Sequence, residues 1–171
     1  MARYARPRSL DEALGLLAEG RWRVLAGGTD FYPALGAGPL KDDVLDITAL
    51  DRLAGIGESD GHLVIGGLTR WSDVAAASLP PAFDALKLAA REVGSIQIQN
   101  RATVAGNLCN ASPAADGVPP LLALDAEVEL RSRAGMRRLP LGRFILGNRR
   151  TELGARELLT AIRVPKTSAE G

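Results

Sequence analysis

Four apolar residues near the start of the chain recur at helical spacing, with polar or small residues between them. The four are Leu10, Ala13, Leu14 and Leu17. One helical face is therefore apolar, as in a surface helix that packs on a core. Ser9 and Glu12 have the spacing of a capping box, and Gly20 is placed to end the helix. The pattern predicts one amphipathic helix between Ser9 and Gly20.

Short apolar runs follow this helix and have the length of strands. They cover 22–26 and 43–47, and one helical turn is expected over 31–35, where Pro33 lies near the start. Together with the helix, these runs predict a small βα lobe over residues 1–50.

From residue 51 onward the pattern changes to hairpins and helices. Turn residues join two pairs of apolar runs, 53–57 with 62–66 and 128–131 with 137–139. The expected helices cover 70–77, with Thr69 as the cap, and 80–92. Residues 119–124 are expected to form a short apolar turn or helix, and a last strand covers 157–163. We therefore predict an α+β fold of two lobes, in which residues 51–171 form a larger mixed or antiparallel sheet with helices.

Two glycine-centred segments carry the candidate chemistry. The first is Val-Leu-Ala-Gly-Gly-Thr-Asp at 24–30, and the second is Thr-Val-Ala-Gly-Asn-Leu-Cys-Asn-Ala-Ser-Pro-Ala-Ala-Asp at 103–116. Each follows a short apolar run of strand length, and neither contains lysine or arginine. Loops of small residues present backbone N–H groups that suit a phosphate-bearing ligand. We expect the two segments to be loops that meet between the lobes.

The first segment pairs two glycines with two polar residues. Gly27 and Gly28 permit backbone angles and a close ligand approach that a Cβ forbids. Thr29 supplies a hydroxyl donor, and Asp30 can accept a hydrogen bond from a ribose hydroxyl or cap the following turn. An ordinary strand-to-helix turn explains the same residues without a ligand. The segment is neither a dinucleotide fingerprint nor a P-loop, since it lacks G-x-G-x-x-G and the P-loop lysine.

The second segment places four short polar side chains within a few positions of one another. They are Asn107, Asn110, Ser112 and Asp116. Burying such groups without partners is costly, so either water or a polar ligand satisfies them. A surface loop of Asx and Ser turns is the alternative interpretation.

Charge and composition exclude several classes of partner. The net charge is +1, and aromatic residues make up 4% of the chain. A net charge this small gives no strong electrostatic field to attract nucleic acid or an anionic membrane. The aromatic content leaves too few rings for base stacking. No apolar stretch approaches the roughly 20 residues of a membrane helix, and no signal-peptide core is present. We predict no nucleic-acid or membrane partner and a reducing, cytoplasmic setting.

The residue inventory predicts neither a catalytic side chain nor a metal site. Cys109 is the single cysteine, so it cannot form an internal disulfide or hold zinc or an iron–sulfur cluster alone. His62 is the single histidine, and a solvated turn residue explains it better than a catalytic base. A solvated loop likewise explains Arg149 better than an anion contact. These residues suit a protein whose cofactor supplies the chemistry.

The motifs resemble those of the FAD-binding medium subunit, or FAD domain, of the molybdenum hydroxylases, the family of xanthine dehydrogenase and aerobic carbon monoxide dehydrogenase. Residues 4–14 are similar to the opening strand and helix of that family. Ala-Gly-Gly-Thr-Asp at 26–30 matches its first FAD segment, and 103–116, continuing through Pro-Leu-Leu-Ala-Leu-Asp at 120–125, matches its second. Phe-Ile-Leu-Gly-Asn-Arg-Arg-Thr at 144–151 also fits, so the resemblance spans nearly the whole chain.

The resemblance implies a two-lobed, PCMH-type fold with FAD held between the lobes. The implied cofactor-binding residues are Leu25, Ala26, Gly27, Gly28, Thr29, Asp30, Val93, Gly94, Thr103, Gly106, Asn107, Leu108, Cys109, Asp116 and Leu153. In this assignment the residues from 25 to 30 line the adenosine and pyrophosphate path, and Thr103, Gly106 and Asn107 hold the pyrophosphate from the other side. Val93 and Gly94 lie beside the cofactor. Asp116 bonds to the ribose or ribityl region, Leu108 and Cys109 approach the flavin, and Leu153 packs near the isoalloxazine ring.

The resemblance also implies an electron path through partner subunits. A molybdopterin-binding large subunit hydroxylates the substrate, and a 2Fe-2S small subunit passes electrons to FAD. The final acceptor is NAD, oxygen or another carrier. Family members usually continue into a further C-terminal domain, whereas this chain stops soon after Val-Pro-Lys at 164–166.

Two other functions stay open at this point. One is a scaffold or assembly subunit of the same complex that binds FAD weakly or not at all, because the C-terminal domain is missing. The other is a single-subunit flavin oxidase, which needs acid–base residues that the sequence does not show.

Overall fold

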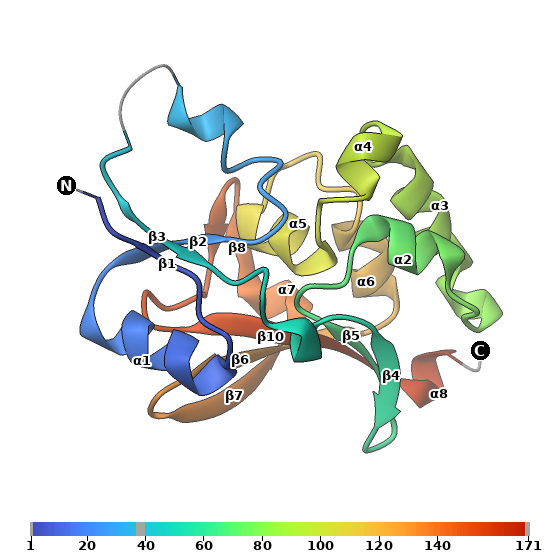
Figure 1. Cartoon of the computed structure of the whole chain (residues 1–171). Coiled ribbons are helices and arrows are strands. Elements are labelled where there is room, and N and C mark those ends of the chain that lie inside the picture. The colour runs from blue at the N-terminus through green and yellow to red at the C-terminus, as the bar shows by residue number, and fades with distance from the viewer. Residues whose placement is uncertain (1, 37–39, 170–171) are drawn as a thin grey trace.

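The computed structural model describes residues 2–36 and 40–169 and contains two main sheets with helices around them (Figure 1). The smaller sheet is parallel, with strand order β1-β3-β2, and consists of β1 (Tyr4–Ala5), β2 (Trp22–Leu25) and β3 (Asp43–Asp46). Helix α1 (Leu10–Glu19) joins β1 to β2, and the 3-10 helix η1 (Pro33–Leu35) follows β2. The predicted βα pattern of the amino-terminal part is confirmed.

Helix α1 begins and ends at the residues that its sequence predicts. The Ser9 side chain accepts a hydrogen bond from the N–H of Glu12 at 3.2 Å. The Glu12 carboxylate in turn accepts from the N–H of Arg8 at 2.9 Å, one residue before the position that a capping box uses. Gly20 is the C-cap, and Ala13, Leu14 and Leu17 are buried as predicted.

The larger sheet is antiparallel and has strand order β4-β5-β10-β6-β7. Its strands are β4 (Ile56–Ser59), β5 (His62–Gly66), β6 (Glu127–Ser132), β7 (Gly135–Pro140) and β10 (Leu158–Pro165). The two predicted hairpins are β4–β5 and β6–β7, and the predicted last strand, β10, lies between them. All but the last residue of β10 are buried, as expected of a central strand.

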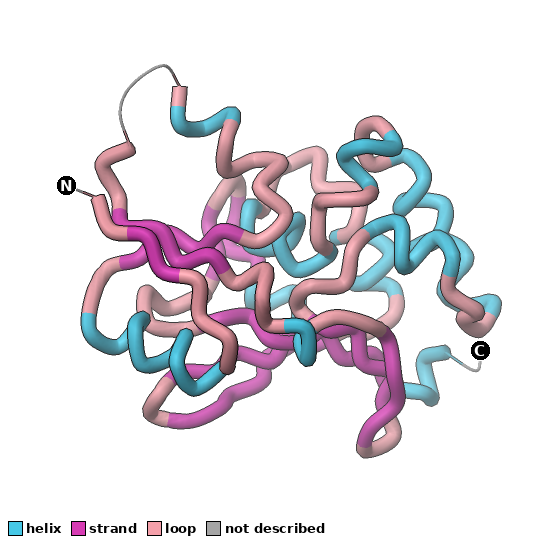
Figure 2. Tube along the Cα trace, viewed as in Figure 1, coloured by secondary structure: helices cyan, strands magenta, loops and turns pink. Residues whose placement is uncertain are grey.

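Most helices gather on one side of the larger sheet (Figure 1). In Figure 2 this group of helices lies at the upper right, and the strands lie to its left and below it. These helices are α2 (Trp71–Ala76), α3 (Asp84–Glu92), α4 (Ile96–Gln99), α5 (Val104–Asn110) and α6 (Val118–Ala123), with η3 (Pro81–Phe83) leading into α3. The remaining elements are η2 (Asp51–Leu53), α7 (Leu141–Phe144), β8 (Ile145–Gly147), β9 (Arg150–Thr151) and α8 (Lys166–Ala169). None of the described helices has the length and apolar character needed to cross a bilayer.

Buried apolar side chains form two clusters. The larger one lies between the antiparallel sheet and the helices and includes Trp71, Phe83 and Phe144. The smaller one surrounds α1 and the parallel sheet, and it also contains Leu68 and Leu158 from later in the chain. Both predicted lobes therefore contribute to the smaller cluster, and the boundary at residue 50 stays a prediction.

The first half of the second glycine segment is a helix, so the loop predicted there after a strand is wrong. Helix α5 occupies half of the segment and is preceded by α4 and an isolated bridge between Arg70 and Thr103. The Thr103 hydroxyl caps α5 by accepting from the N–H of Gly106 at 3.0 Å. Val104, Ala105 and Leu108 share a buried face. This cap and apolar spacing outweigh the turn preference of the Gly-Asn pair.

Thr69 does not cap α2, contrary to the sequence prediction. Its side chain is buried, and its hydroxyl donates to the carbonyl of Gly55 at 2.8 Å. Arg70 is the N-cap residue, and its N–H donates to the Asp73 carboxylate at 2.9 Å. The threonine hydroxyl instead joins the start of α2 to the turn before β4.

Candidate functional site

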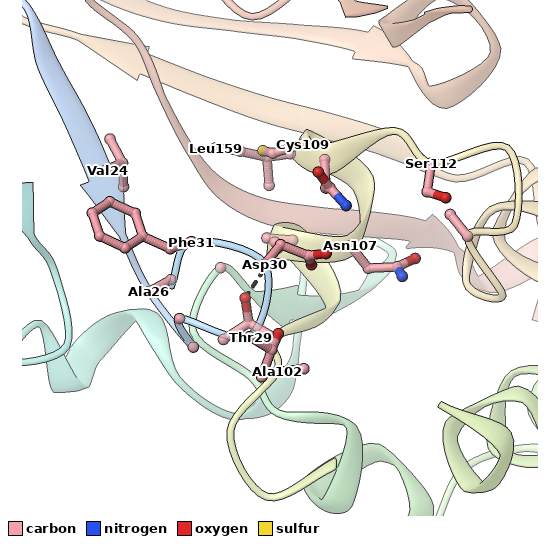
Figure 3. Close-up of a pocket in the computed structure, with 18 of the residues that line it drawn as sticks. Val24, Ala26, Thr29, Asp30, Phe31, Ala102, Asn107, Cys109, Ser112 and Leu159 are labelled. Carbon is pink, nitrogen blue, oxygen red and sulfur yellow. Dashed lines mark hydrogen bonds between the residues drawn. The ribbon is translucent and has the colours of Figure 1, made fainter. Parts of the chain in front are cut away.

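A cavity of about 850 Å³ opens between the loop after β2 and helix α5. The first glycine segment lines one wall, and Thr103, Gly106 and Asn107 line another (Figure 3). The two segments thus meet at one cavity, as the sequence predicts, while the division into lobes stays a prediction. The volume lies within the range of cofactor-sized sites in proteins.

The loop after β2 presents a run of unused backbone donors. The N–H groups from Gly27 to Phe31 donate to no protein acceptor within the two described ranges, 2–36 and 40–169. The residues that carry these groups also line the cavity. Backbone N–H groups need hydrogen-bond partners, so the loop suits a ligand that brings several acceptor oxygens.

The two glycines of this loop serve two different purposes. A Cβ on Gly27 would lie 2.2 Å from the carbonyl oxygen of Arg101, so only glycine lets the loop pack on the chain before α5. Gly28 has φ +79°, a left-handed conformation that glycine adopts without strain. Gly27 therefore lets the loop after β2 pack against the backbone at 101–102, and Gly28 turns the loop over the cavity.

The wall across from this loop carries polar groups of α5 and the turn that follows it. The Asn107 side-chain oxygen accepts from the N–H of Gly117 at 3.3 Å, and the Ser112 hydroxyl accepts from the N–H of Ala114 at 3.3 Å. The Ser turn of the alternative interpretation is therefore present. Asn110 also lines the cavity, and its side-chain oxygen accepts from the Arg149 guanidinium at 2.8 Å.

Eleven of the fifteen residues that the resemblance assigns to FAD line this cavity. They are Ala26, Gly27, Gly28, Thr29, Asp30, Val93, Thr103, Gly106, Asn107, Cys109 and Leu153. The other four do not line it: Leu25 and Leu108 are buried in the interior, Asp116 is exposed, and Gly94 follows Val93 with φ +54°. The cavity brings together both glycine segments and Leu153, which is distant in sequence.

Several cavity residues were not assigned to the site from the sequence. Arg23 and Phe31 line it as a pair, with the Arg23 guanidinium 4.5 Å from the centre of the Phe31 ring. Arg149 lines it as well, although a solvated loop was expected there. Trp71, Leu159 and Glu157 come from other elements. No spacing in the sequence indicates that these side chains meet, because their approach depends on how the two lobes pack.

The sequence offers Cys109 and His62 as the candidate nucleophile and base. Burial raises the pKa of the Cys109 thiol to about 12, so the thiol stays protonated near neutral pH. His62 Nδ1 lies 2.7 Å from the carbonyl of Asp60, and His62 does not line the cavity. Of these two residues only Cys109 lines the cavity, and its raised pKa does not favour a nucleophilic thiolate.

The Cys109 side chain, which is half-buried, leads to a labelling prediction. In the native chain Cys109 is expected to react with iodoacetamide at least about tenfold more slowly than in the denatured chain at the same pH, because the raised pKa suppresses the thiolate. The alkylation rate by mass spectrometry measures this. Equal rates in the two states would show that the thiol is accessible. Cys109→Ala is expected to retain any bound cofactor, because alanine keeps the wall apolar.

Sequence comparisons agree with the geometry of this site. Residues 1–167 match a family model described as the FAD binding domain in molybdopterin dehydrogenase. The chain is 35% identical over 173 residues to the xanthine dehydrogenase FAD-binding subunit of Escherichia coli O157:H7, covering 99% of the chain and 59% of that subunit. It is also 35% identical over 165 residues to the glyceraldehyde dehydrogenase medium chain of Sulfolobus acidocaldarius, covering 95% and 59%.

Solved structures show the same fold. Carbon monoxide dehydrogenase from Hydrogenophaga pseudoflava, in a form lacking the Mo-pyranopterin moiety, matches with a TM-score of 0.85 at 30% identity, over 96% of this chain and 58% of that chain. Quinoline 2-oxidoreductase from Pseudomonas putida 86 matches with a TM-score of 0.86 at 26% identity, over 96% and 59%. The chain thus spans about three fifths of the length of these relatives.

Proposed function

The chain belongs to the family of FAD-binding domains of molybdopterin dehydrogenases, and we propose that its cavity holds FAD for electron transfer within such an oxidoreductase. The membership confirms the resemblance that the motifs show. FAD supplies the redox chemistry when bound, since it accepts electrons one at a time and releases them in pairs. The chain itself binds the cofactor, orients it and limits its contact with water.

The unused N–H groups from Gly27 to Phe31 are the observation that carries this proposal. A pyrophosphate brings two negative charges and several acceptor oxygens to a loop that has donors and no lysine. Across the cavity, Gly106 has no side chain to block a close approach, and the Thr103 hydroxyl lies beside it. Neutral donors on both walls suit an internal pyrophosphate, which needs no strong cation to be held.

The two ends of the cavity suit the two ring systems of FAD. Arg23 and Phe31 offer a flat cation and an aromatic ring at one end (Figure 3 shows Phe31 beside Val24). Cys109 and Leu153 offer apolar surface elsewhere on the wall. We place the adenine beside Phe31 and the isoalloxazine ring beside Leu153. This placement agrees with the residue roles that the resemblance implies.

The names of the relatives support membership of a multi-subunit enzyme, and the particular partners are part of the proposal. We place the chain between a 2Fe-2S small subunit and a molybdopterin-binding large subunit, with NAD or another carrier as the final acceptor. In that arrangement the large subunit selects the substrate. A scaffold subunit that holds FAD weakly is the alternative, and the free donors and unblocked glycines of the cavity argue against it.

A comparison of FAD with riboflavin tests the proposal. The flavin-free chain is titrated with each compound, and flavin fluorescence and co-elution on gel filtration report binding. We expect one FAD per chain and riboflavin affinity at least about 100-fold weaker, because riboflavin lacks both the pyrophosphate and the adenosine. Equal affinity for both compounds would contradict the role of the glycine segments. A chain that elutes from gel filtration without flavin after incubation with excess FAD would favour the scaffold alternative.

A further inference from the structure

We infer that Arg137, a residue outside the cavity, positions the stretch of cavity wall that carries Leu153 and Glu157. This inference rests on the proposed FAD site. Arg137 lies on β7, the edge strand of the antiparallel sheet, opposite Leu130 of β6. Leu153 and Glu157 line the cavity, whereas Arg137 does not.

The wall in question is the segment 152–157, here called the wall segment, which joins β9 to β10. It contains neither helix nor strand, so regular backbone bonding does not hold it in place. Its first residue is fixed by one backbone bond, from the N–H of Glu152 to the carbonyl of Phe144 at 2.9 Å. The Leu153 side chain packs against the larger core cluster. Within the rest of the wall segment, one further backbone bond joins the N–H of Glu157 to the carbonyl of Gly154, and the other hydrogen bonds involve side chains.

The Arg137 guanidinium donates hydrogen bonds to the first and the last residue of the wall segment. Its Nε donates to Glu157 Oε1 at 2.7 Å, and its Nη2 donates to Glu157 Oε2 at 2.8 Å. The same Nη2 donates to the carbonyl oxygen of Glu152 at 2.8 Å. One guanidinium therefore spans the two ends between which Leu153 lies. A planar guanidinium with several fixed donors can do this, and a lysine ammonium cannot reproduce the geometry.

Glu157, which accepts from Arg137, also forms hydrogen bonds with the backbone of the wall segment. Its Oε2 also accepts from the N–H of Gly154 at 2.8 Å, and its own N–H donates to the carbonyl of Gly154 at 3.0 Å. The hydrogen bond from Arg137 is the main cause that keeps the pKa of Glu157 below its usual value. The carboxylate thus stays charged near neutral pH and serves Arg137 and Gly154 together.

The position of this wall matters more for binding than for folding. Exposed ion pairs contribute little to stability, and the Arg137 side chain is 43% exposed. Supporting contacts that fix a binding wall have a larger effect on the site, since small displacements of a wall spoil its fit to a ligand. We therefore assign Arg137 the role of a positioning residue for the end of the cavity where we place the isoalloxazine ring.

Arg138, the next residue on β7, offers a matched control. It makes a similar paired contact, with Nε and Nη2 at 3.1 and 2.9 Å from Glu129 Oε2. Glu129 is buried and does not line the cavity. Removing Arg138 takes one of the partners from a buried carboxylate, so its effect on folding is expected to be at least as large as that of removing Arg137. Any loss confined to the Arg137 variant then reports on the site.

The test compares Arg137→Gln with Arg138→Gln in the FAD-loaded chain. We expect FAD release about tenfold faster in Arg137→Gln, with a changed fluorescence yield of the bound flavin, and release within about twofold of wild type in Arg138→Gln. Glu157→Gln is expected to match Arg137→Gln, and the double variant is expected to be no worse than either, because the two side chains act as one unit. Arg137→Lys is expected to restore the release rate only in part.

Hydrogen exchange separates this inference from the proposed function. The N–H groups of Gly154 and Glu157 are expected to exchange faster in Arg137→Gln than in wild type, with or without FAD. Wild-type release and an unchanged flavin signal in Arg137→Gln would overturn the positioning role while leaving the FAD site intact. Failure of the wild-type chain to bind FAD, with the faster exchange still present, would instead overturn the proposed function.

Discussion

An alanine in place of Gly27 is expected to abolish FAD binding and to lower the free energy of unfolding by about 1–3 kcal/mol. The added Cβ would lie 2.2 Å from the Arg101 carbonyl oxygen and 2.9 Å from Cα of Ala102. Both contacts are backbone, so no side-chain rotation relieves them. The loop after β2 must move away from the chain before α5, and the two walls of the cavity then separate.

Gly57→Ala is the matched control for this substitution. Gly57 lies in β4, its φ is outside the left-handed region, and a Cβ there meets nothing within 4 Å. We expect FAD affinity and stability close to wild type for this variant. FAD titration and chemical denaturation of both variants measure the two effects. Normal FAD binding by Gly27→Ala would show that the contact between the loop after β2 and the backbone at 101–102 is more plastic than the structure indicates.

A valine in place of Gly106 is expected to weaken FAD binding at least about 100-fold, equivalent to about 2.7 kcal/mol, with the fold retained. Gly106 lies in the first turn of α5, where a branched side chain would occupy the space that the pyrophosphate needs. The new Cβ would also lie 2.8 Å from the Thr103 hydroxyl oxygen and displace the helix cap. Loss of a cap alone costs about 1 kcal/mol of stability, so the chain remains folded.

Gly15→Val places the same side chain in α1 and controls for the effect of valine on a helix. A Cβ at Gly15 meets only the end of the Arg133 side chain, at 3.7 Å, and Gly15 does not line the cavity. We expect stability close to wild type, because valine has a slightly higher helix propensity than glycine, and unchanged FAD affinity. Equal FAD affinities for Gly106→Val and wild type would mean that the cofactor does not approach this turn of α5.

Local signals explain why much of the fold was predictable from the sequence. The bounds of α1 follow from Ser9, Glu12 and Gly20. The side chains of Ser9 and Glu12 bond within a few residues of the helix start, and Gly20, which has no side chain, ends the helix. The hairpins β4–β5 and β6–β7 follow from apolar runs on either side of turn residues. These contacts are short in sequence, so spacing alone indicates them.

Competing local signals explain the main error in the fold. The segment at 103–116 contains both a threonine suited to cap a helix and a Gly-Asn pair suited to a turn. The cap and the buried face of Val104, Ala105 and Leu108 decide the outcome in favour of α5. Because α5 is a helix, the Leu108 side chain faces the core and does not line the cavity. The resemblance had assigned Leu108 to the flavin.

Contacts between distant parts of the chain explain what the sequence could not indicate at the site. The pairing of Arg149 with Asn110 joins the turn after β8 to the end of α5. The pairing of Arg137 with Glu157 joins a sheet edge to the cavity wall. Charged residues of this kind are frequent on any surface, so only the folded geometry distinguishes these pairs from solvated side chains.

A crystal structure of the chain with FAD would show whether the loop after β2 holds the pyrophosphate. We expect phosphate oxygens at about 3 Å from backbone nitrogens within 27–31, facing Gly106 across the cavity. Phosphates bound elsewhere on the chain, with the N–H groups of this loop still unused, would show that the loop is not the pyrophosphate site.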